Sequence, residues 1–146
     1  MPRYFHIDEA RKLLGAVDRL IGRACLLKEE HDSSAQQMQA MQQRVAEMGG
    51  VILDRRRMAE HRSRREEAAA ELKAIIDQVH EMGVQVKDLD IGLVDFPTLY
   101  RDQEVLLCWK RGEQDIEYWH GLEEGFRGRK AIDREFLDNH HGDAGD

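Results

Sequence analysis

The side chains best suited to chemistry lie in the last third of the chain and are Asp95, His120 and Glu123. If the chain turns helical at His120, Glu123 lies three residues further along and shares its face, a spacing with which histidine and carboxylate bind one metal. Asp95, at a predicted strand end, supplies a third ligand. Imidazole and carboxylate suit zinc, manganese or ferrous iron, and an open coordination position would activate water. These residues predict a divalent-metal site and, as one alternative function, a metal-dependent hydrolase or small-ligand enzyme.

The same residues also have a purely structural interpretation, which we favour on general grounds. Asp95 would cap a turn or pair with Arg129, and His120 would hydrogen-bond the backbone at the sheet edge beside Trp119. The chain has 29 acidic residues, so a histidine and an acid three positions apart occur often by chance. Trp109 and Trp119 could line a ligand pocket, but large aromatic residues on facing strands are first of all core and cross-strand residues.

Two further side chains could bind or react. Arg129 follows Gly125 and Gly128, and glycine backbone N–H groups with a guanidinium would bind an anion such as phosphate. The segment lacks a complete Walker or dinucleotide motif, so a tight turn with an exposed or salt-bridged arginine is favoured. Cys108 could act as a nucleophile only with His120 on the next strand as its base. Its apolar neighbours favour a buried, inert thiol.

The basic residues concentrate in one segment, Arg55 to Arg65, which holds six arginines. This segment could bind RNA or an acidic partner. Acidic residues interleave with the arginines, and the run covers three helical turns, so a solvated helix start is favoured. The net charge of -7 also opposes a phosphate backbone, because DNA binding needs clustered Lys and Arg. Nucleic acid is therefore not the expected partner.

Long helices must position these residues, because the 146-residue chain is 35% charged and has only 2 prolines. Apolar residues recur at steps of three and four and predict a helix over 8–48 that continues through Asp32–Ser34, with at most a kink. Gly49–Gly50 predicts a reversal, and a second stripe predicts a helix over 54–83. Two such helices bury their stripes as an antiparallel hairpin, in the manner of a coiled coil.

After residue 83 the apolar period becomes that of strands, which predicts a small β-meander over 84–119. Pro97 is expected to end one strand, because it cannot donate to a ladder. Residues 120–137 are expected to form a short helix and loops, and residues 138–146, which include His140–His141, a disordered tail. The predicted fold is a single α+β domain, mainly α, in which a long antiparallel helical hairpin precedes a small C-terminal antiparallel β-meander.

Several short motifs lie between Val86 and Ile132: Lys87-Asp88-Leu89-Asp90, Gly92-Leu93-Val94-Asp95-Phe96-Pro97, Leu107-Cys108-Trp109, Gly112-Glu113, Tyr118-Trp119-His120 and Gly125-Phe126-Arg127-Gly128-Arg129. In these motifs the chain resembles a bacterial family known only as domain of unknown function 2203. It departs from the family in two places: the turn at 101–104 lacks a glycine, and Gly121 replaces an acid. The resemblance implies the fold and cytoplasmic residence, and it implies no activity.

The function we predict is that of a cytoplasmic, self-associating interaction module, and enzymatic activity is left open. Two helices bury only part of their apolar surface against each other, so Met38, Met41, Met48 and Met58 are expected to face a partner helix. A symmetric homodimer is the simplest outcome, and another protein is the alternative partner. No segment approaches the roughly 18 apolar residues of a membrane helix, and no signal peptide is evident, so no membrane is involved.

Overall fold

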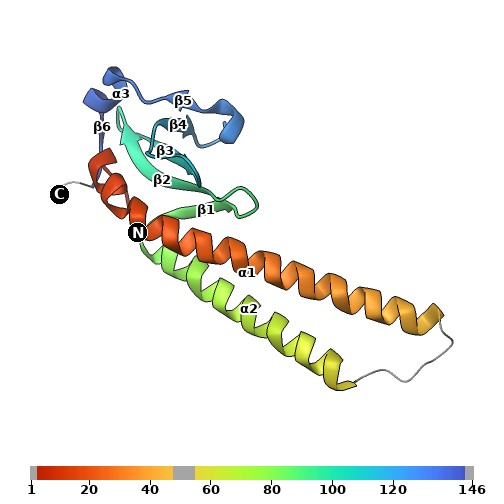
Figure 1. Cartoon of the computed structure of the whole chain (residues 1–146). Coiled ribbons are helices and arrows are strands. Elements are labelled where there is room, and N and C mark those ends of the chain that lie inside the picture. The colour runs from red at the N-terminus through yellow and green to blue at the C-terminus, as the bar shows by residue number, and fades with distance from the viewer. Residues whose placement is uncertain (1–2, 48–54, 144–146) are drawn as a thin grey trace.

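The computed structural model describes residues 3–47 and 55–143, which form mainly helices together with one antiparallel sheet (Figure 1). The helices are α1 (Ile7–Glu47), α2 (Arg55–Glu81), the short α3 (Arg134–Asn139) and a single 3-10 turn, η1 (Phe126–Gly128). The strands are β1 (Gln85–Asp88), β2 (Leu93–Tyr100), β3 (Gln103–Lys110), β4 (Tyr118–Gly121), β5 (Lys130–Ala131) and β6 (His140–His141). The predicted α+β class, with helix predominating, is confirmed.

Helix α1 is continuous over 41 residues and passes through Asp32–Ser34 without a break. This continuity follows from the sequence, since the apolar period carries on across the segment and no proline interrupts it. Helix α2 ends at Glu81, and Gly83 follows with φ +91, the left-handed conformation that glycine adopts at helix ends. The predicted reversal at Gly49–Gly50 lies outside the described residues.

The two long helices lie side by side and run in opposite directions (Figure 1). Arg23 Nε donates to Glu71 Oε1 (3.0 Å), and further out Ser34 Oγ donates to the His61 carbonyl (3.2 Å). As the residue number rises on α1 it falls on α2, as an antiparallel pair requires. Beside these contacts a small core forms from Ala24, Leu27, Ala68 and Ile75.

The first half of α1 packs on one face of the sheet. Val17 and Ile21 contribute to the main core with Val94, Phe96 and Trp109 of the strands. All five side chains are at most 2% exposed. The sheet is therefore fixed to the base of the helix pair, and the rest of the pair extends away from it (Figure 1).

One glycine of α1 permits a close approach between helix and sheet. Gly22 is buried, and a Cβ there would lie 2.8 Å from Nη2 of Arg111, which directly follows β3. Arg111 crosses the helix at this point and pairs with Asp18 (3.3 Å). A larger residue at position 22 would displace this arginine.

The sheet has the strand order β1-β2-β3-β4-β5, and β6 adds to β2. Strand β2 continues through Pro97 to Tyr100, so the prediction that Pro97 ends the strand is wrong. The Pro97 carbonyl accepts from Phe5 N–H (2.7 Å), which places the carbonyl and the ring nitrogen on the edge away from β3. The missing N–H therefore costs no hydrogen bond between β2 and β3.

The C-terminal segment differs from the predicted disordered tail. Residues 140–141 form β6 and pair with Leu99 and Tyr100 of β2, while residues 144–146 lie outside the described residues. The buried His140 ring stacks on Phe136, and its Nε2 accepts from Ile7 N–H (3.1 Å). This long-range contact, which satisfies an N–H at the start of α1, orders the segment.

The contact between His140 and α1 predicts sensitivity to acid. Burial, reinforced by His6, lowers the pKa of His140, whereas the Phe136 and Leu137 carbonyls and Asp8 favour its charged form. Below about pH 6.5 the unfolded chain therefore binds a proton that the folded chain does not. The free energy of unfolding should decrease as the pH is lowered through this range, and it should keep its full value at higher pH.

His140→Asn should lower the free energy of unfolding by about 1–3 kcal/mol at neutral pH, because Ile7 N–H loses its buried acceptor.

Urea unfolding of the wild type and of His140→Asn, at neutral pH and at about pH 5, measures both effects. His80→Asn is the matched control, because His80 is exposed on α2. The control should keep the acid-induced loss of the wild type, and His140→Asn should show a smaller loss. Equal losses in all three proteins would assign the acid sensitivity to other groups.

Candidate functional site

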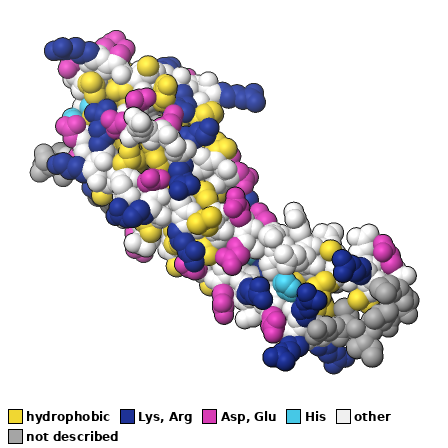
Figure 2. Space-filling view, viewed as in Figure 1, with side chains coloured by type: hydrophobic (Ala, Val, Ile, Leu, Met, Phe, Trp, Pro, Cys, Tyr) yellow, Lys and Arg dark blue, Asp and Glu magenta, His cyan; other side chains and the backbone are white. Residues whose placement is uncertain are grey.

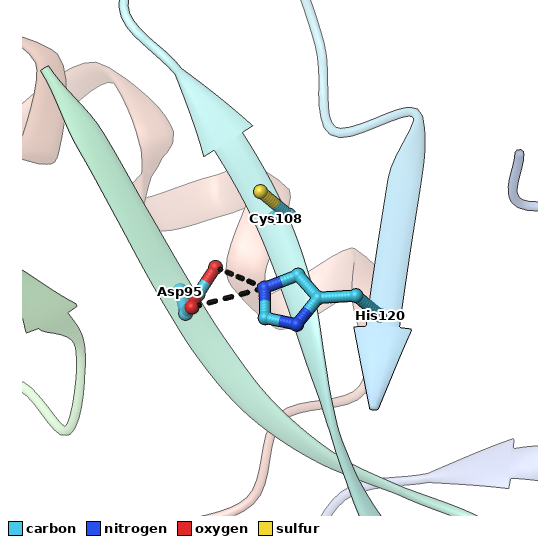
Figure 3. A group of neighbouring side chains, drawn as sticks. All are labelled: Asp95, Cys108 and His120. Atoms are coloured by element: carbon cyan, nitrogen blue, oxygen red, sulfur yellow. Dashed lines mark hydrogen bonds and ion pairs between the residues drawn. The ribbon is translucent and has the colours of Figure 1, made fainter. Parts of the chain in front are cut away.

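Three adjacent strands bring Asp95, Cys108 and His120 together (Figure 3). Asp95 of β2 lies opposite Cys108 of β3, and His120 of β4 lies opposite Leu106, two residues before Cys108. Because side chains alternate along a strand, all three project from one face of the sheet, opposite to the face that packs on α1. One ligand atom from each lies within 4.8 Å of the others. All three are buried, with exposures of 1%, 0% and 3%.

The hydrogen bonds of His120 define where its protons lie. Its Nδ1 is 2.7 Å from the Gly121 carbonyl, and its Nε2 is 3.1 Å from each Asp95 oxygen. A carbonyl only accepts, so Nδ1 carries a proton. One further proton is shared between Nε2 and the carboxylate, which gives either imidazolium with carboxylate or imidazole with carboxylic acid. The pair is neutral overall in both forms.

The electrostatics of the cluster disfavour isolated charge. Burial raises the pKa of the Asp95 carboxyl, and the hydrogen bond and positive charge of His120 oppose this rise. Burial and the nearby Asp95 charge raise the pKa of Cys108 to about 12, against the effect of Arg129. At neutral pH the free thiol is therefore protonated. It is unsuited to nucleophilic attack, as the apolar neighbours of Cys108 in the sequence indicate.

The structure separates Glu123 from the other predicted ligands. His120 lies in β4 rather than at a helix start, so the helical spacing of three residues does not apply, and Glu123 is exposed in the turn that follows. Cys108 takes the third place instead. Cys108 shares a face with His120 because Leu106, the residue opposite His120, and Cys108 occupy alternate positions of β3. The alternation was predictable from the sequence, but the pairing of β3 with β4 in this register was not.

Arg129, the predicted anion-binding residue, is engaged by other protein groups. Its Nη2 donates to both Glu113 oxygens (2.6 and 2.9 Å), and its guanidinium carbon lies 3.9 Å from the Tyr118 ring centroid and 4.8 Å from that of Phe126. The side chain is only 11% exposed. A free anion would have to compete with Glu113 for this charge.

The remaining sequence candidates lie elsewhere. Trp109 is a core residue at 2% exposure, and Trp119 contacts the rings of Tyr100 and Phe136, so both act as packing residues. The arginines of Arg55–Arg65 lie at the start of α2, far from the sheet, where Lys and Arg side chains gather in the space-filling view (Figure 2). In this segment Arg56 pairs with Glu60 at 3.6 Å.

The helix pair beyond the sheet is a second feature of interest, and we refer to residues 23–47 and 55–76 as the arm. Its two sides differ in chemistry, as the helical spacing of their residues shows. One side carries the ion pair between Arg23 and Glu71 in a hollow lined largely by charged residues. The other side has a groove of about 240 Å³, lined by His31, Ala69, Leu72, Lys73 and Ile76. At the level of these residues the arm therefore has a polar hollow on one side and a largely apolar groove on the other.

The buried pair of Asp95 and His120 predicts a large loss of stability on truncation. His120→Ala leaves the Asp95 carboxyl buried without its partner, so the free energy of unfolding should fall by about 3–5 kcal/mol. Arg134→Ala is the control, since the Arg134 side chain is 93% exposed and its only ion pair, among the described residues, is long at 3.9 Å. Urea unfolding followed by circular dichroism measures both. A His120→Ala protein as stable as the control would contradict the prediction.

Comparison with protein families supports the resemblance found in the motifs of the last third of the chain, and the match also covers the helices. A family model described as "Uncharacterized conserved protein (DUF2203)" matches residues 3–132. No curated protein and no solved structure matches the chain. None of the helices in the described ranges combines the length and apolar character needed to cross a membrane. The chain therefore belongs to the DUF2203 family of uncharacterised conserved proteins.

Proposed function

We propose that the protein is a cytoplasmic interaction module that self-associates by docking the apolar side of its arm against the arm of a second copy. The observation that carries this proposal is the groove whose apolar lining residues are Ala69, Leu72 and Ile76. These residues recur at steps of three and four, so they form a stripe along α2. The stripe lies beside the one that α2 buries against α1 through Ala68 and Ile75.

The scarcity of core in the outer arm supports the same proposal. Among the described residues 31–47 and 55–67, only Ser34 and Met38 are buried. Residues 33–43 carry no charge, in a chain that is 35% charged. Helices gain most of their stability from packing an apolar face, so a pair with so few buried residues benefits from further helices.

The docking surface differs from the predicted methionine surface. Met38 is only 6% exposed, so the expectation that it faces outward is wrong. Met41 and Met58 are half-buried, and Met48 lies outside the described residues. Apolar residues spaced by three and four positions predict which side of a helix is apolar, but they do not say which of these residues contact the other helix of the hairpin. The rotation of each helix about its own axis decides which apolar residues stay exposed.

A second copy is the simplest occupant of the groove. A two-fold axis between two arms would present the same stripe from each side and turn two helix pairs into a four-helix bundle. Each α2 would then bury apolar residues against two neighbouring helices. The two cysteines are free thiols, which fits a reducing compartment such as the cytoplasm.

The alternative functions have less support. A hydrolase needs an open coordination position that substrate can reach, and the Asp95 cluster is at most 3% exposed. RNA binding through Arg55–Arg65 would rely on arginines that share their helix with acids, such as Glu60 beside Arg56. Self-association is therefore the function that we put forward.

The proposal predicts the effect of one substitution in the groove. Ala69→Glu places a charge in the apolar groove and should convert the dimer into a monomer at micromolar concentration, because the carboxylate would be desolvated on docking. Analytical ultracentrifugation measures the change. Ala70→Glu is a closely matched control, because Ala70 is also exposed on α2 but does not line the groove. This control should remain a dimer.

A wild-type protein that sediments as a monomer at micromolar concentration would overturn the proposal. Equal loss of dimer in both glutamate variants would place the interface on another face. Retention of the dimer in Ala69→Glu would do the same.

A further inference from the structure

We infer that Asp95, Cys108 and His120 form a binding site for one divalent transition-metal ion of the Zn²⁺ type. This site is independent of the arm and of self-association. It differs from the site predicted from the sequence, because the thiol of Cys108 replaces the carboxylate of Glu123 as the third ligand.

The first argument is geometric. A tetrahedral ion with bonds of about 2.0–2.3 Å holds its ligand atoms about 3.3–3.8 Å apart. Here Nε2 of His120 lies 3.1 Å from each Asp95 oxygen, and ligand atoms of all three residues lie within 4.8 Å of one another. Side-chain shifts of about 1 Å or less would complete three coordination bonds. The ligands come from three paired strands, so the backbone holds them in place.

The second argument is the orientation of the histidine. Nδ1–H donates to the Gly121 carbonyl, which turns Nε2 toward Asp95 and fixes it as the coordinating nitrogen. Metal-binding histidines almost always donate their second ring N–H in this way, which orients the ring and raises its basicity. The acceptor is the carbonyl of Gly121, the residue that directly follows His120, so no other part of the chain is needed to orient the ring.

The third argument is the balance of charge in a buried site. Without metal the cluster is neutral, because Asp95 and His120 share one proton and Cys108 holds another. A divalent ion that displaces these two protons meets one carboxylate, one thiolate and a neutral imidazole, so the cluster is again neutral. A monovalent ion that displaced both protons would leave one negative charge buried, which is costly at exposures of 3% or less.

The ligand chemistry then selects the metal. A thiolate and an imidazole favour Zn²⁺ and similar transition metals over Mg²⁺ and Ca²⁺, which prefer oxygen ligands. The low exposure of the cluster means that entry and release require local opening of the sheet or of the turn after β4. The bound ion should therefore exchange slowly with chelators.

The test uses Co²⁺ as a spectroscopic probe on the full chain without an affinity tag. Metal content of the wild type is measured after expression in zinc-containing medium, and the protein is then refolded with Co²⁺. We expect one ion per chain and a sulfur-to-cobalt charge-transfer absorption, which surface histidines and carboxylates cannot produce. Cys108→Ser should lose the absorption and the stoichiometric metal. Cys25→Ser, which removes the half-buried thiol of α1, should keep both.

Asp95→Asn provides a second variant if Cys108→Ser fails to fold, and it should bind Co²⁺ more weakly while retaining some thiolate absorption. Wild-type protein that takes up no Zn²⁺ and no Co²⁺ would overturn the inference. Charge-transfer absorption in Cys108→Ser equal to that of Cys25→Ser would also overturn it. Neither result depends on whether the arm forms a dimer.

Discussion

The architecture depends on the burial of one continuous apolar stripe along α1. Near its start, Ala10, Val17 and Ile21 pack against the sheet, and further along Ala24 and Leu27 pack against α2. The same helix therefore contributes to two separate cores, one with the sheet and one with α2, whose buried residues differ. Because one rigid element serves both, the orientation of the sheet relative to the helix pair is set by the helical period of this stripe. Gly22 lies at the junction, where Arg111 crosses.

The parts that were predictable from the sequence are those governed by local period. The three- and four-residue spacing predicted the long first helix through Asp32–Ser34, and the change of period after residue 83 predicted strands. Asp95 and His120 were correctly expected near one another. Glu123 was not, because the choice between helix and strand at His120 depends on pairing with β3, a contact between residues distant in the chain. The order of residues 140–143 depends in the same way on Ile7 and β2.

The family motifs acquire a structural explanation from their contacts. Glu113 of the Gly-Glu motif binds Arg129 of the last glycine-rich motif, and its backbone carbonyl accepts from Trp109 Nε1 (2.9 Å). Asp95 and His120, from two further motifs, bind each other. Residues of several motifs thus contact one another on or beside the sheet, whereas the helices carry general apolar patterning. The metal site that we infer lies on the sheet, and the self-association that we propose uses the arm.

The hydrogen bonds between the two ends of the described chain have a practical consequence. Tyr4 N–H donates to Asp143 Oδ1 (3.3 Å), and Asp143 N–H donates to the Tyr4 carbonyl (3.1 Å). A fluorophore attached near Tyr4 and one attached near Asp143 would therefore lie at the same corner of the protein. This corner is remote from the outer end of the arm (Figure 1). A donor dye at the corner of one molecule and an acceptor dye at the outer end of the arm of another would report by energy transfer whether the two molecules lie parallel or antiparallel.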